Sequence, residues 1–235
     1  MRLFRFHGVD KFERDFDFIE SSKFWSSRIE DLNDPSEAFI DLKELGQVSN
    51  LYLRFFKPFR KNKKELVQDL VDAIQNAINI KKEGGVYCLS KTVSNELMWA
   101  HYASGHKGYC LEYDSSNLRV INPNDIGFSL HSKLIDIKYS DKIQSLKIDS
   151  ARDANSIAET IFSNKSNSWK YEQESRIITQ MAGEHNYNKE SLKAIHFGLR
   201  VDEKIVLKMT NNLDLDFYRI ERLENSYTLE SKKIE

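Results

Sequence analysis

The sequence predicts an α+β fold, a mixed and mainly antiparallel sheet with helices packed against it. Short segments with strand-like alternation outnumber helical ones, and the links between them are short. Strands and helices do not alternate regularly, which disfavours a doubly wound parallel sheet. Only three prolines occur, and no Pro/Gly/Ser-rich linker divides the chain. Residues 1–235 are therefore expected to form a single domain.

The chain opens with an alternating segment. Leu3, Arg5 and His7 share one face of a predicted strand and Phe4 and Phe6 share the other, because successive side chains point to opposite faces. Further strands are expected at residues 24–25, 85–90, 108–113, 134–139, 175–180, 194–199 and 215–220. Helices are expected at residues 66–78, 95–103, 153–162 and 202–209.

Two of these assignments rest on particular local signals. Leu66, Leu70, Ile74 and Ile78 recur every four residues, which is typical of an amphipathic helix. The segment 33–35 reads Asn-Asp-Pro and predicts a turn, because Asn and Asp bond back to their own backbone and Pro fixes φ.

The composition excludes several classes of protein. Hydrophobic residues make up 40% of the chain and aromatic ones 11%, enough for a real core. The net charge of −1 provides no global attraction to nucleic acid or membrane. Cys88 and Cys110 do not form a disulfide framework, and no apolar run has the length of a signal peptide or a membrane span. We expect a cytoplasmic protein without a membrane partner.

The acidic segment 169–178, WKYEQESRII, is the first that could carry chemistry. In a strand, Glu172, Glu174 and Arg176 would point to one face. One carboxylate can then stabilise a developing cation while the other orients a nucleophile. The alternative is an edge strand with a solvated charged face.

A second segment is dense in aromatic residues and histidine. Trp99 and Tyr102 could stack on a base or on nicotinamide, and His101 and His106 could exchange protons near neutral pH. The alternative is a helix, a glycine turn and a strand with structural roles only. The spacing of His101, His106 and Cys110 fits no usual zinc pattern and lacks a fourth ligand, so we predict no metal site there.

Two further features are open to more than one interpretation. Ser90, at the end of a predicted strand, could orient a ligand or cap its own turn. Residues 54–64 contain six basic residues, three phenylalanines and no acid, which indicates either single-stranded nucleic acid binding or a solvated loop. The candidate nucleic-acid-binding residues are Arg54, Lys57, Arg60 and Lys61.

Several familiar motifs are missing from the sequence. It has no GxxxxGK[ST] loop, GxGxxG, GxSxG, HExxH or CxxC. These absences disfavour a P-loop NTPase, a Rossmann dehydrogenase, an α/β-hydrolase and a zincin.

Four segments together resemble a large bacterial family of unknown function. They are LNDPSE at 32–37, CLS at 88–90, MWAHYASGHKGYCLEYD at 98–114 and WKYEQESR at 169–176. The likeness covers roughly residues 3 to 200. That family in turn distantly resembles ADP-ribosyltransferases, including the DNA-targeting toxins of bacterial toxin–antitoxin systems.

The resemblance implies a division of roles among the candidate residues. ADP-ribosyltransferases carry an Arg or His on the first strand, matched here by Arg5 or His7. Their Ser-Thr-Ser-like strand would correspond to residues 88–90, where Cys replaces the first Ser and the role rests on Ser90. Their later Glu, often in an ExE pair, would correspond to Glu172 and Glu174.

In that scheme Glu174 is the catalytic carboxylate and Glu172 its partner at the acceptor. The residues expected to bind NAD as substrate are Arg5, His7, Ser90, Trp99, His101 and Tyr102. The resulting hypothesis is an NAD-dependent ADP-ribosyltransferase, a toxin or phage-defence effector that modifies RNA, DNA or protein. A neutralising antitoxin would be its partner.

Two other functions stay open from the sequence. One is a metal-dependent nuclease or hydrolase built on Glu172 and Glu174. The other is a non-catalytic module that binds a nucleotide or a partner protein through the region from Trp99 to Tyr113.

Overall fold

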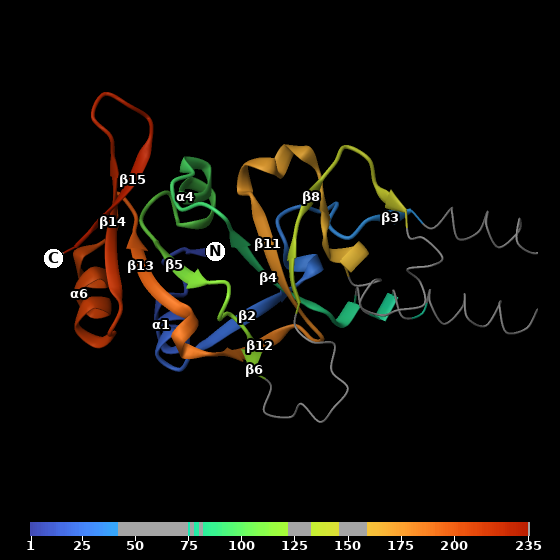
Figure 1. Cartoon of the computed structure of the whole chain (residues 1–235), viewed down its shortest axis with the longest axis horizontal. Coiled ribbons are helices and arrows are strands. Elements are labelled where there is room, and N and C mark those ends of the chain that lie inside the picture. Colours follow the sequence, from blue (N-terminus) through green and yellow to red (C-terminus); the bar gives the residue numbers. More distant parts are fainter. Residues whose placement is uncertain (42–74, 76–77, 80–81, 122–132, 146–158, 235) are drawn as a thin grey trace, which may run out of the picture.

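A computed structural model describes residues 1–41, 75, 78–79, 82–121, 133–145 and 159–234 (Figure 1). The basic segment 54–64 and most of the predicted helix at 66–78 lie outside the described residues.

Within these ranges, eleven strands form one mostly antiparallel sheet. Its order is β15-β14-β13-β5-β1-β4-β2-β12-β6, with β11 paired to β4 and β7 paired to β11. The strands are β1 (Arg2–His7), β2 (Lys23–Arg28), β4 (Gly85–Ser90), β5 (Tyr109–Asp114), β6 (Val120–Ile121), β7 (Lys133–Asp136), β11 (Glu174–Thr179), β12 (Gly183–Tyr187), β13 (Leu192–Phe197), β14 (Asp216–Arg222) and β15 (Leu229–Lys233). Only β13 and β14 run parallel among the pairs of this sheet in the described residues. The predicted α+β class is confirmed.

Short elements outside the main sheet complete the described chain. Two small parallel pairs join β8 (Lys138–Tyr139) to β10 (Asn164–Lys165) and β3 (Ile40–Asp41) to β9 (Gln144–Ser145). The helices are α1 (Phe12–Glu20), α4 (Glu96–Tyr102), α6 (Glu203–Asn212) and the 3₁₀ turns η1 (Ile29–Asp31), η3 (Asn167–Glu172) and η4 (Lys189–Ser191).

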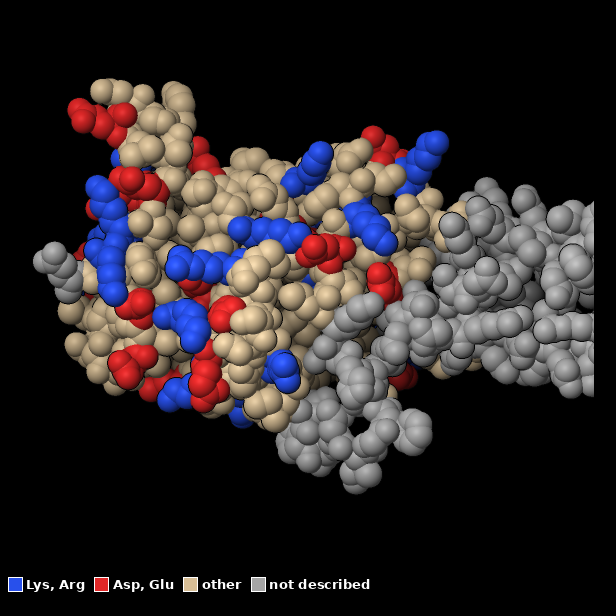
Figure 2. All heavy atoms as spheres, in the orientation of Figure 1, with Lys and Arg blue, Asp and Glu red and all other residues tan. Residues whose placement is uncertain are grey.

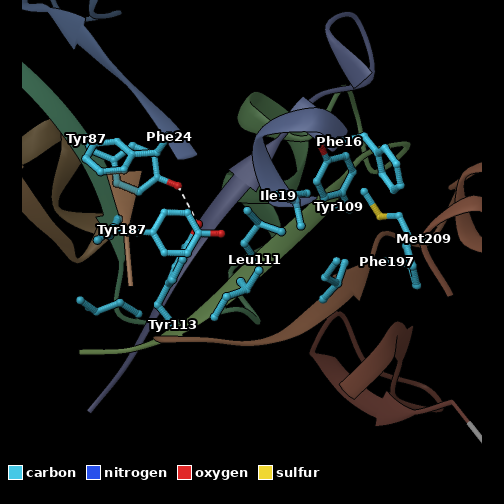
Figure 3. Close-up of a cluster of buried hydrophobic side chains, with 14 of the residues drawn as sticks. Phe16, Ile19, Phe24, Tyr87, Tyr109, Leu111, Tyr113, Tyr187, Phe197 and Met209 are labelled. Carbon is cyan, nitrogen blue, oxygen red and sulfur yellow. Dashed lines mark hydrogen bonds between the residues drawn. The ribbon is translucent and has the colours of Figure 1, made fainter. Parts of the chain in front are cut away.

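Helices cover both faces of the sheet. Phe16 of α1 and Met209 of α6 pack with Leu3 and Leu111 on one face, in the core that Figure 3 shows. Trp99 of α4 packs on the other face. Because both faces are buried, the alternation of Leu3 and Phe4 in β1 sends one side chain into each core.

The sheet opens between β1 and β4. These strands share a single registered pair, Phe4 with Ser90, whereas β1 pairs with β5 over six residues and β4 pairs with β11 over six. The far end of β4 pairs instead with β2, at Val86 and Gly85. The Arg5 Nη1 atom donates to the Cys88 carbonyl at 2.8 Å, so this side chain connects β1 to β4 where the two backbones are not paired.

Most predicted elements are confirmed among the described residues, with differences at four elements. Of the helix expected at 153–162, residues 153–158 lie outside the described residues and residues 159–162 are helical. The strand expected at 134–139 is interrupted at Ile137, between β7 and β8. Helix α1 was not predicted, although its Phe12, Phe16 and Ile19 follow a helical spacing, and β12 and β15 near the sheet edges were not predicted either. None of the helices in the described ranges has the length and apolar character that crossing a bilayer requires.

Candidate functional site

A cavity of about 670 Å³ lies at the split between β1 and β4. Its lining comes from β1, α1, β2, the turn after η1, β4, α4 and β11, so distant parts of the chain meet there. Ligand pockets in proteins typically measure roughly 300–1,000 Å³. The cavity is therefore large enough for a dinucleotide-sized molecule.

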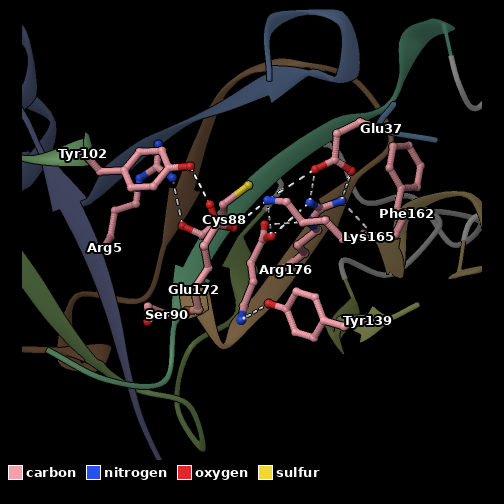
Figure 4. Close-up of polar contacts among 11 residues, drawn as sticks. Arg5, Glu37, Cys88, Ser90, Tyr102, Tyr139, Phe162, Lys165, Glu172 and Arg176 are labelled. Carbon is pink, nitrogen blue, oxygen red and sulfur yellow. Dashed lines mark hydrogen bonds and ion pairs between the residues drawn. The ribbon is translucent and has the colours of Figure 1, made fainter. Parts of the chain in front are cut away.

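Three carboxylates and two cations form a buried cluster in the cavity wall (Figure 4). Arg176 holds Glu174 through Nε at 2.6 Å and Nη2 at 3.0 Å, and it holds Glu37 through Nη1 at 2.9 Å and Nη2 at 2.6 Å. The Lys165 Nζ atom lies 2.5 Å from Glu172 Oε2, 3.0 Å from Glu174 Oε2 and 3.4 Å from Glu37 Oε1. We call these five residues the carboxylate cluster. Its formal charge, three acids against two bases, is −1.

The backbone around Glu172 differs from the expected strand. Glu172 ends the 3₁₀ turn η3, Gln173 adopts a left-handed conformation with φ 46°, and Glu174 begins β11. The prediction that Glu172 shares a strand face with Glu174 and Arg176 was wrong for Glu172. Both carboxylates still meet at the Lys165 ammonium, which contacts Glu172 Oε2 and Glu174 Oε2.

Two side chains fix the position of η3 at the cavity. The Ser90 hydroxyl donates to the Glu172 carbonyl at 2.7 Å, and Asn95 Nδ2 donates to the Tyr171 carbonyl at 2.7 Å. The Tyr102 hydroxyl donates to Glu172 Oε1 at 2.5 Å. Ser90 lines the cavity, and its hydroxyl positions the backbone of Glu172.

Two residues of the carboxylate cluster, Glu37 and Lys165, were not predicted from the sequence. The predicted turn carries Glu37 inward: Asp34 Oδ1 accepts from the Ser36 amide at 2.9 Å, and Asp34 O accepts from the Glu37 amide at 3.0 Å. The turn residues in LNDPSE at 32–37 were therefore a local sequence signal for the position of Glu37. Lys165 lies on a two-residue strand and follows no motif, so nothing local in the sequence marks it.

The two predicted catalytic carboxylates have opposite pKa shifts. Burial raises the pKa of Glu172, and Lys165 and Tyr102 only partly offset that effect. Burial would also raise the pKa of Glu174, but Arg176 and Lys165 outweigh it and lower the pKa to about 2. Glu174 is thus held as an anion, whereas Glu172 takes up a proton more readily.

The β1 side of the cavity carries Arg5 and His7, and both line it. The guanidinium of Arg5 lies over the Tyr87 ring at 4.9 Å, and His7 Nδ1 lies 2.9 Å from Asp15 Oδ2. The Arg5 Nε and His7 Nε2 atoms are buried and have no hydrogen-bond partner within the protein. Such atoms are costly unless a ligand or water meets them.

Two predicted ligand-binding residues lie elsewhere. Trp99 is fully buried in the core, its Nε1 donates to the Val93 carbonyl at 2.6 Å, and its ring packs edge-on against Phe6. His101 is exposed on α4. Neither lines the cavity, which corrects the expectation that they contact NAD. The cavity does bring together Arg5, His7, Ser90, Tyr102, Glu172 and Glu174.

The sequence elements considered for zinc do not converge. Cys110 is buried in the core, and His106 stacks on Trp99 with ring centroids 6.4 Å apart. Among the described residues, no group of three or more His, Cys, Asp and Glu side chains is arranged to hold a metal ion.

A comparison with known protein families gives a match to part of the chain. Residues 98–177 match the family described as protein of unknown function (DUF2971). The matched segment runs from α4 to β11 and includes Tyr102, Lys165, Glu172, Glu174 and Arg176. This supports the predicted relation to a domain family of unknown function. No curated protein and no solved structure matches significantly.

Proposed function

We propose that this chain is an ADP-ribosyltransferase that binds NAD in the cavity between β1 and β4. The observation that carries the proposal is the pairing of Glu172 and Glu174 in one cavity wall, with opposite pKa shifts, facing the same cavity as Arg5. Pairs of titratable groups whose pKa values are pushed apart are typical of acid–base sites.

The chemistry assigns a separate role to each carboxylate. When the bond between C1′ of the ribose and the nicotinamide nitrogen breaks, its electron pair leaves with nicotinamide and positive charge develops on the ribose. Glu174, held as an anion, stabilises that charge in a buried environment. Glu172 accepts the proton of the acceptor nucleophile as its new bond to C1′ forms. The raised pKa of Glu172 favours this second role.

The part of the cavity lining that lies outside the carboxylate cluster suits an anionic pyrophosphate. Four basic residues belong to it: Arg5, Lys11, Arg14 and Lys23. The acidic lining residues outside the carboxylate cluster are Asp15 and Asp31. The buried Nε of Arg5 is a donor without a partner. A guanidinium is the side chain best suited to phosphate oxygens, because its donors are planar and always charged.

The carboxylate cluster favours group transfer over metal-dependent hydrolysis. Lys165 Nζ already lies between Glu172 and Glu174, where a divalent ion would need to coordinate both. Arg176 occupies both oxygens of Glu174. A metal could bind there only by displacing a buried ammonium, with a large electrostatic cost.

The acceptor and the biological setting belong to this proposal as well. We propose nucleic acid or protein as acceptor, and a cytoplasmic toxin or phage-defence effector with a neutralising antitoxin as the setting. The visible face of the molecule carries interspersed charges of both signs (Figure 2). The candidate basic residues of segment 54–64, proposed to bind a nucleic acid acceptor, lie outside the described residues.

The test is release of nicotinamide and transfer of label from NAD labelled in the adenine ring. The purified chain is incubated with NAD and with total RNA, DNA or protein, and the label is separated by acceptor. Variants Glu172→Gln and Glu174→Gln are compared with Glu112→Gln, a matched buried glutamate outside the cavity that pairs with His196 at 2.7 Å.

We expect nicotinamide release and transfer by the wild-type chain and by Glu112→Gln. Both should fall at least about 100-fold in Glu174→Gln, as is typical when transition-state stabilisation is removed. Thermal denaturation of each variant separates lost chemistry from lost folding. NAD left intact by the wild-type chain with every acceptor class, or activity unchanged in both cavity variants, would contradict the proposal.

A further inference from the structure

A second chain of polar contacts lies outside the cavity, at the β15 end of the sheet. His196 of β13 stands between two side chains: its Nε2 atom is 2.7 Å from Glu112 Oε2 on β5, and its Nδ1 atom is 2.6 Å from Ser231 Oγ on β15. The other oxygen of Glu112 lies 3.0 Å from Arg2 Nε. We call Glu112, His196 and Ser231 the serine relay. None of the three lines the cavity between β1 and β4.

The contacts of His196 set the tautomer of its neutral ring. The carboxylate of Glu112 can only accept hydrogen bonds, so the ring proton resides on Nε2. The Nδ1 atom then carries a lone pair and accepts the hydrogen bond of the Ser231 hydroxyl. The ring stacks on Tyr218 with centroids 4.8 Å apart and meets Phe4 edge-on, which restrains its plane. The base is therefore directed at Ser231 before any substrate binds.

Ser231 is the accessible end of the relay. The side chains of His196 and Glu112 are 3% and 5% exposed. Ser231 is half-buried and lies on β15, the outermost strand at this end of the sheet in the described part of the chain (Figure 1). An activated serine lies within hydrogen-bond reach, about 2.6–3.2 Å, of a base that a third group orients. Both contacts of the relay meet this condition.

A second pocket, of about 370 Å³, lies beside the relay. Its lining includes Glu112 and also Tyr218, the residue that stacks on His196. Its volume is near the lower end of the range for ligand pockets, roughly 300–1,000 Å³, so it suits a small molecule. The charged lining residues are Arg2, Glu112, Asp114, Lys193 and Asp216. Charges of both signs favour a short polar group over a long alkyl chain.

We propose that Ser231 is the nucleophile of a second activity, the hydrolysis of esters of short acyl groups. Ser231 Oγ attacks the carbonyl carbon while its proton passes to His196 Nδ1. The bond from that carbon to the alkoxy oxygen then breaks, and the alcohol leaves with the proton. Water attacks the acyl-serine in the same way, which releases the carboxylic acid and restores the hydroxyl.

Glu112 is a positioning residue in this scheme, because it contacts only the imidazole and not the ester. It holds the proton of the neutral ring on Nε2 and stabilises the imidazolium that forms during each attack. Neither step uses NAD or the carboxylate cluster. The inference therefore stands or falls independently of the proposed transferase.

The test uses a fluorophosphonate probe, which reacts with activated serines, on the purified full chain. Mass spectrometry locates the label, and hydrolysis of p-nitrophenyl acetate and p-nitrophenyl octanoate is measured alongside. The variants are Ser231→Ala, His196→Gln and Glu112→Gln. The matched control is Ser226→Ala, since Ser226 is also half-buried and lies next to β15, but its hydroxyl contacts Thr228 at 3.0 Å.

We expect the label on Ser231 in the wild-type chain and in Ser226→Ala, with acetate hydrolysed faster than octanoate. Labelling at this position and hydrolysis should be lost in Ser231→Ala and fall at least about 100-fold in His196→Gln, as is typical when a general base is removed. In Glu112→Gln the amide can donate to Nε2, so the ring proton should move to Nδ1 and labelling should fall. Histidine ¹⁵N NMR reads that move directly, and a merely structural contact would not link it to labelling.

Three results would overturn the inference: no label on Ser231 of the wild-type chain, undiminished hydrolysis by Ser231→Ala, or a proton on Nδ1 of wild-type His196 at the assay pH. Faster hydrolysis of the octanoate would overturn the proposed substrate class. Thermal denaturation of each variant separates lost chemistry from lost folding. Ser231→Ala removes a single half-buried hydroxyl, so the test remains decisive if the core substitution His196→Gln does not fold.

Discussion

Lys165 is the residue whose removal tests the electrostatics of the site most strongly. Its ammonium contacts Glu172, Glu174 and Glu37 at 2.5, 3.0 and 3.4 Å, and its side chain is 7% exposed. Lys165→Met keeps an unbranched side chain of similar reach and removes the charge. The formal charge of the carboxylate cluster then changes from −1 to −2, with Arg176 as its only remaining cation.

The expected loss is large because three buried carboxylates would share one cation. Removing one partner of a buried ion pair costs about 3–5 kcal/mol of the free energy of unfolding. In a chain of this size, that corresponds to a fall in Tm of roughly 6–20 °C.

The loss should depend on pH. Lys165 is the strongest charge that lowers the pKa of Glu172, so in the variant that pKa, already raised by burial, rises further. In the unfolded chain a glutamate has a pKa of about 4.3. At pH values between this pKa and the higher folded-state pKa of Glu172, the folded variant therefore binds more protons than the unfolded variant. The destabilisation is therefore complete above the folded pKa and shrinks as the pH falls through it.

The assay is urea denaturation followed by tryptophan fluorescence, at pH 5 and pH 8. Four proteins form a double-mutant cycle: the wild-type chain, Lys165→Met, Glu172→Gln and the variant that carries both changes. We expect the double variant to be more stable than Lys165→Met at pH 8, since it no longer buries the unpaired charge. Lys233→Met is the control, because its pair with Asp216 is more than half exposed and should leave Tm unchanged. Equal stability of Lys165→Met and the wild-type chain, or the same loss at both pH values, would refute the electrostatic reasoning.

Three further predictions follow from particular contacts. Ser90→Ala removes the hydroxyl that holds the Glu172 carbonyl at 2.7 Å; it should cost about 1 kcal/mol of stability but reduce nicotinamide release more strongly than that loss of folding explains. Glu37→Gln keeps the shape of the side chain and weakens its hold on Arg176, which should destabilise the chain by roughly 1–3 kcal/mol in urea denaturation. Gly108→Ala should lower Tm more than Gly105→Ala, because a Cβ at Gly108 would lie 1.9 Å from the His7 carbonyl oxygen, whereas at Gly105 only the left-handed φ of 63° opposes it. A Gly108→Ala chain as stable as wild type would contradict this packing.

Much of the sheet could be predicted because strand alternation is local. The strands at residues 3–7, 85–90 and 194–199 were expected from their own side chains, and the pattern of Glu174 and Arg176 on one face followed in the same way. Such periodicity reports which side chains share a face, but not which strands become neighbours.

The cavity could not be predicted because it depends on register between distant strands. It exists because β1 and β4 pair only at Phe4 and Ser90, a contact between residues 86 positions apart in the chain. Lys165 joins the carboxylate cluster from a two-residue strand through packing that no nearby residue signals, whereas the turn at residues 33–35 gave a local signal for Glu37. A strand pattern also could not reveal that Gln173 is left-handed, which moved Glu172 off the strand.

The roles of the residues on α4 depended on how that helix is oriented against the sheet. Trp99 faces the core and Tyr102 reaches Glu172, while His101 lies between them on the exposed side. Helical periodicity separates these directions, but it does not indicate which of them meets the cavity. Of the three ligand-binding residues proposed in the aromatic segment, only Tyr102 lines the cavity.

The most direct test of the account is a crystal structure of the chain with a non-hydrolysable NAD analogue. The account predicts the dinucleotide in the split between β1 and β4, with its nicotinamide ribose against Glu172 and Glu174 and its pyrophosphate at Arg5. An analogue bound outside this cavity, or with its ribose far from both carboxylates, would contradict it.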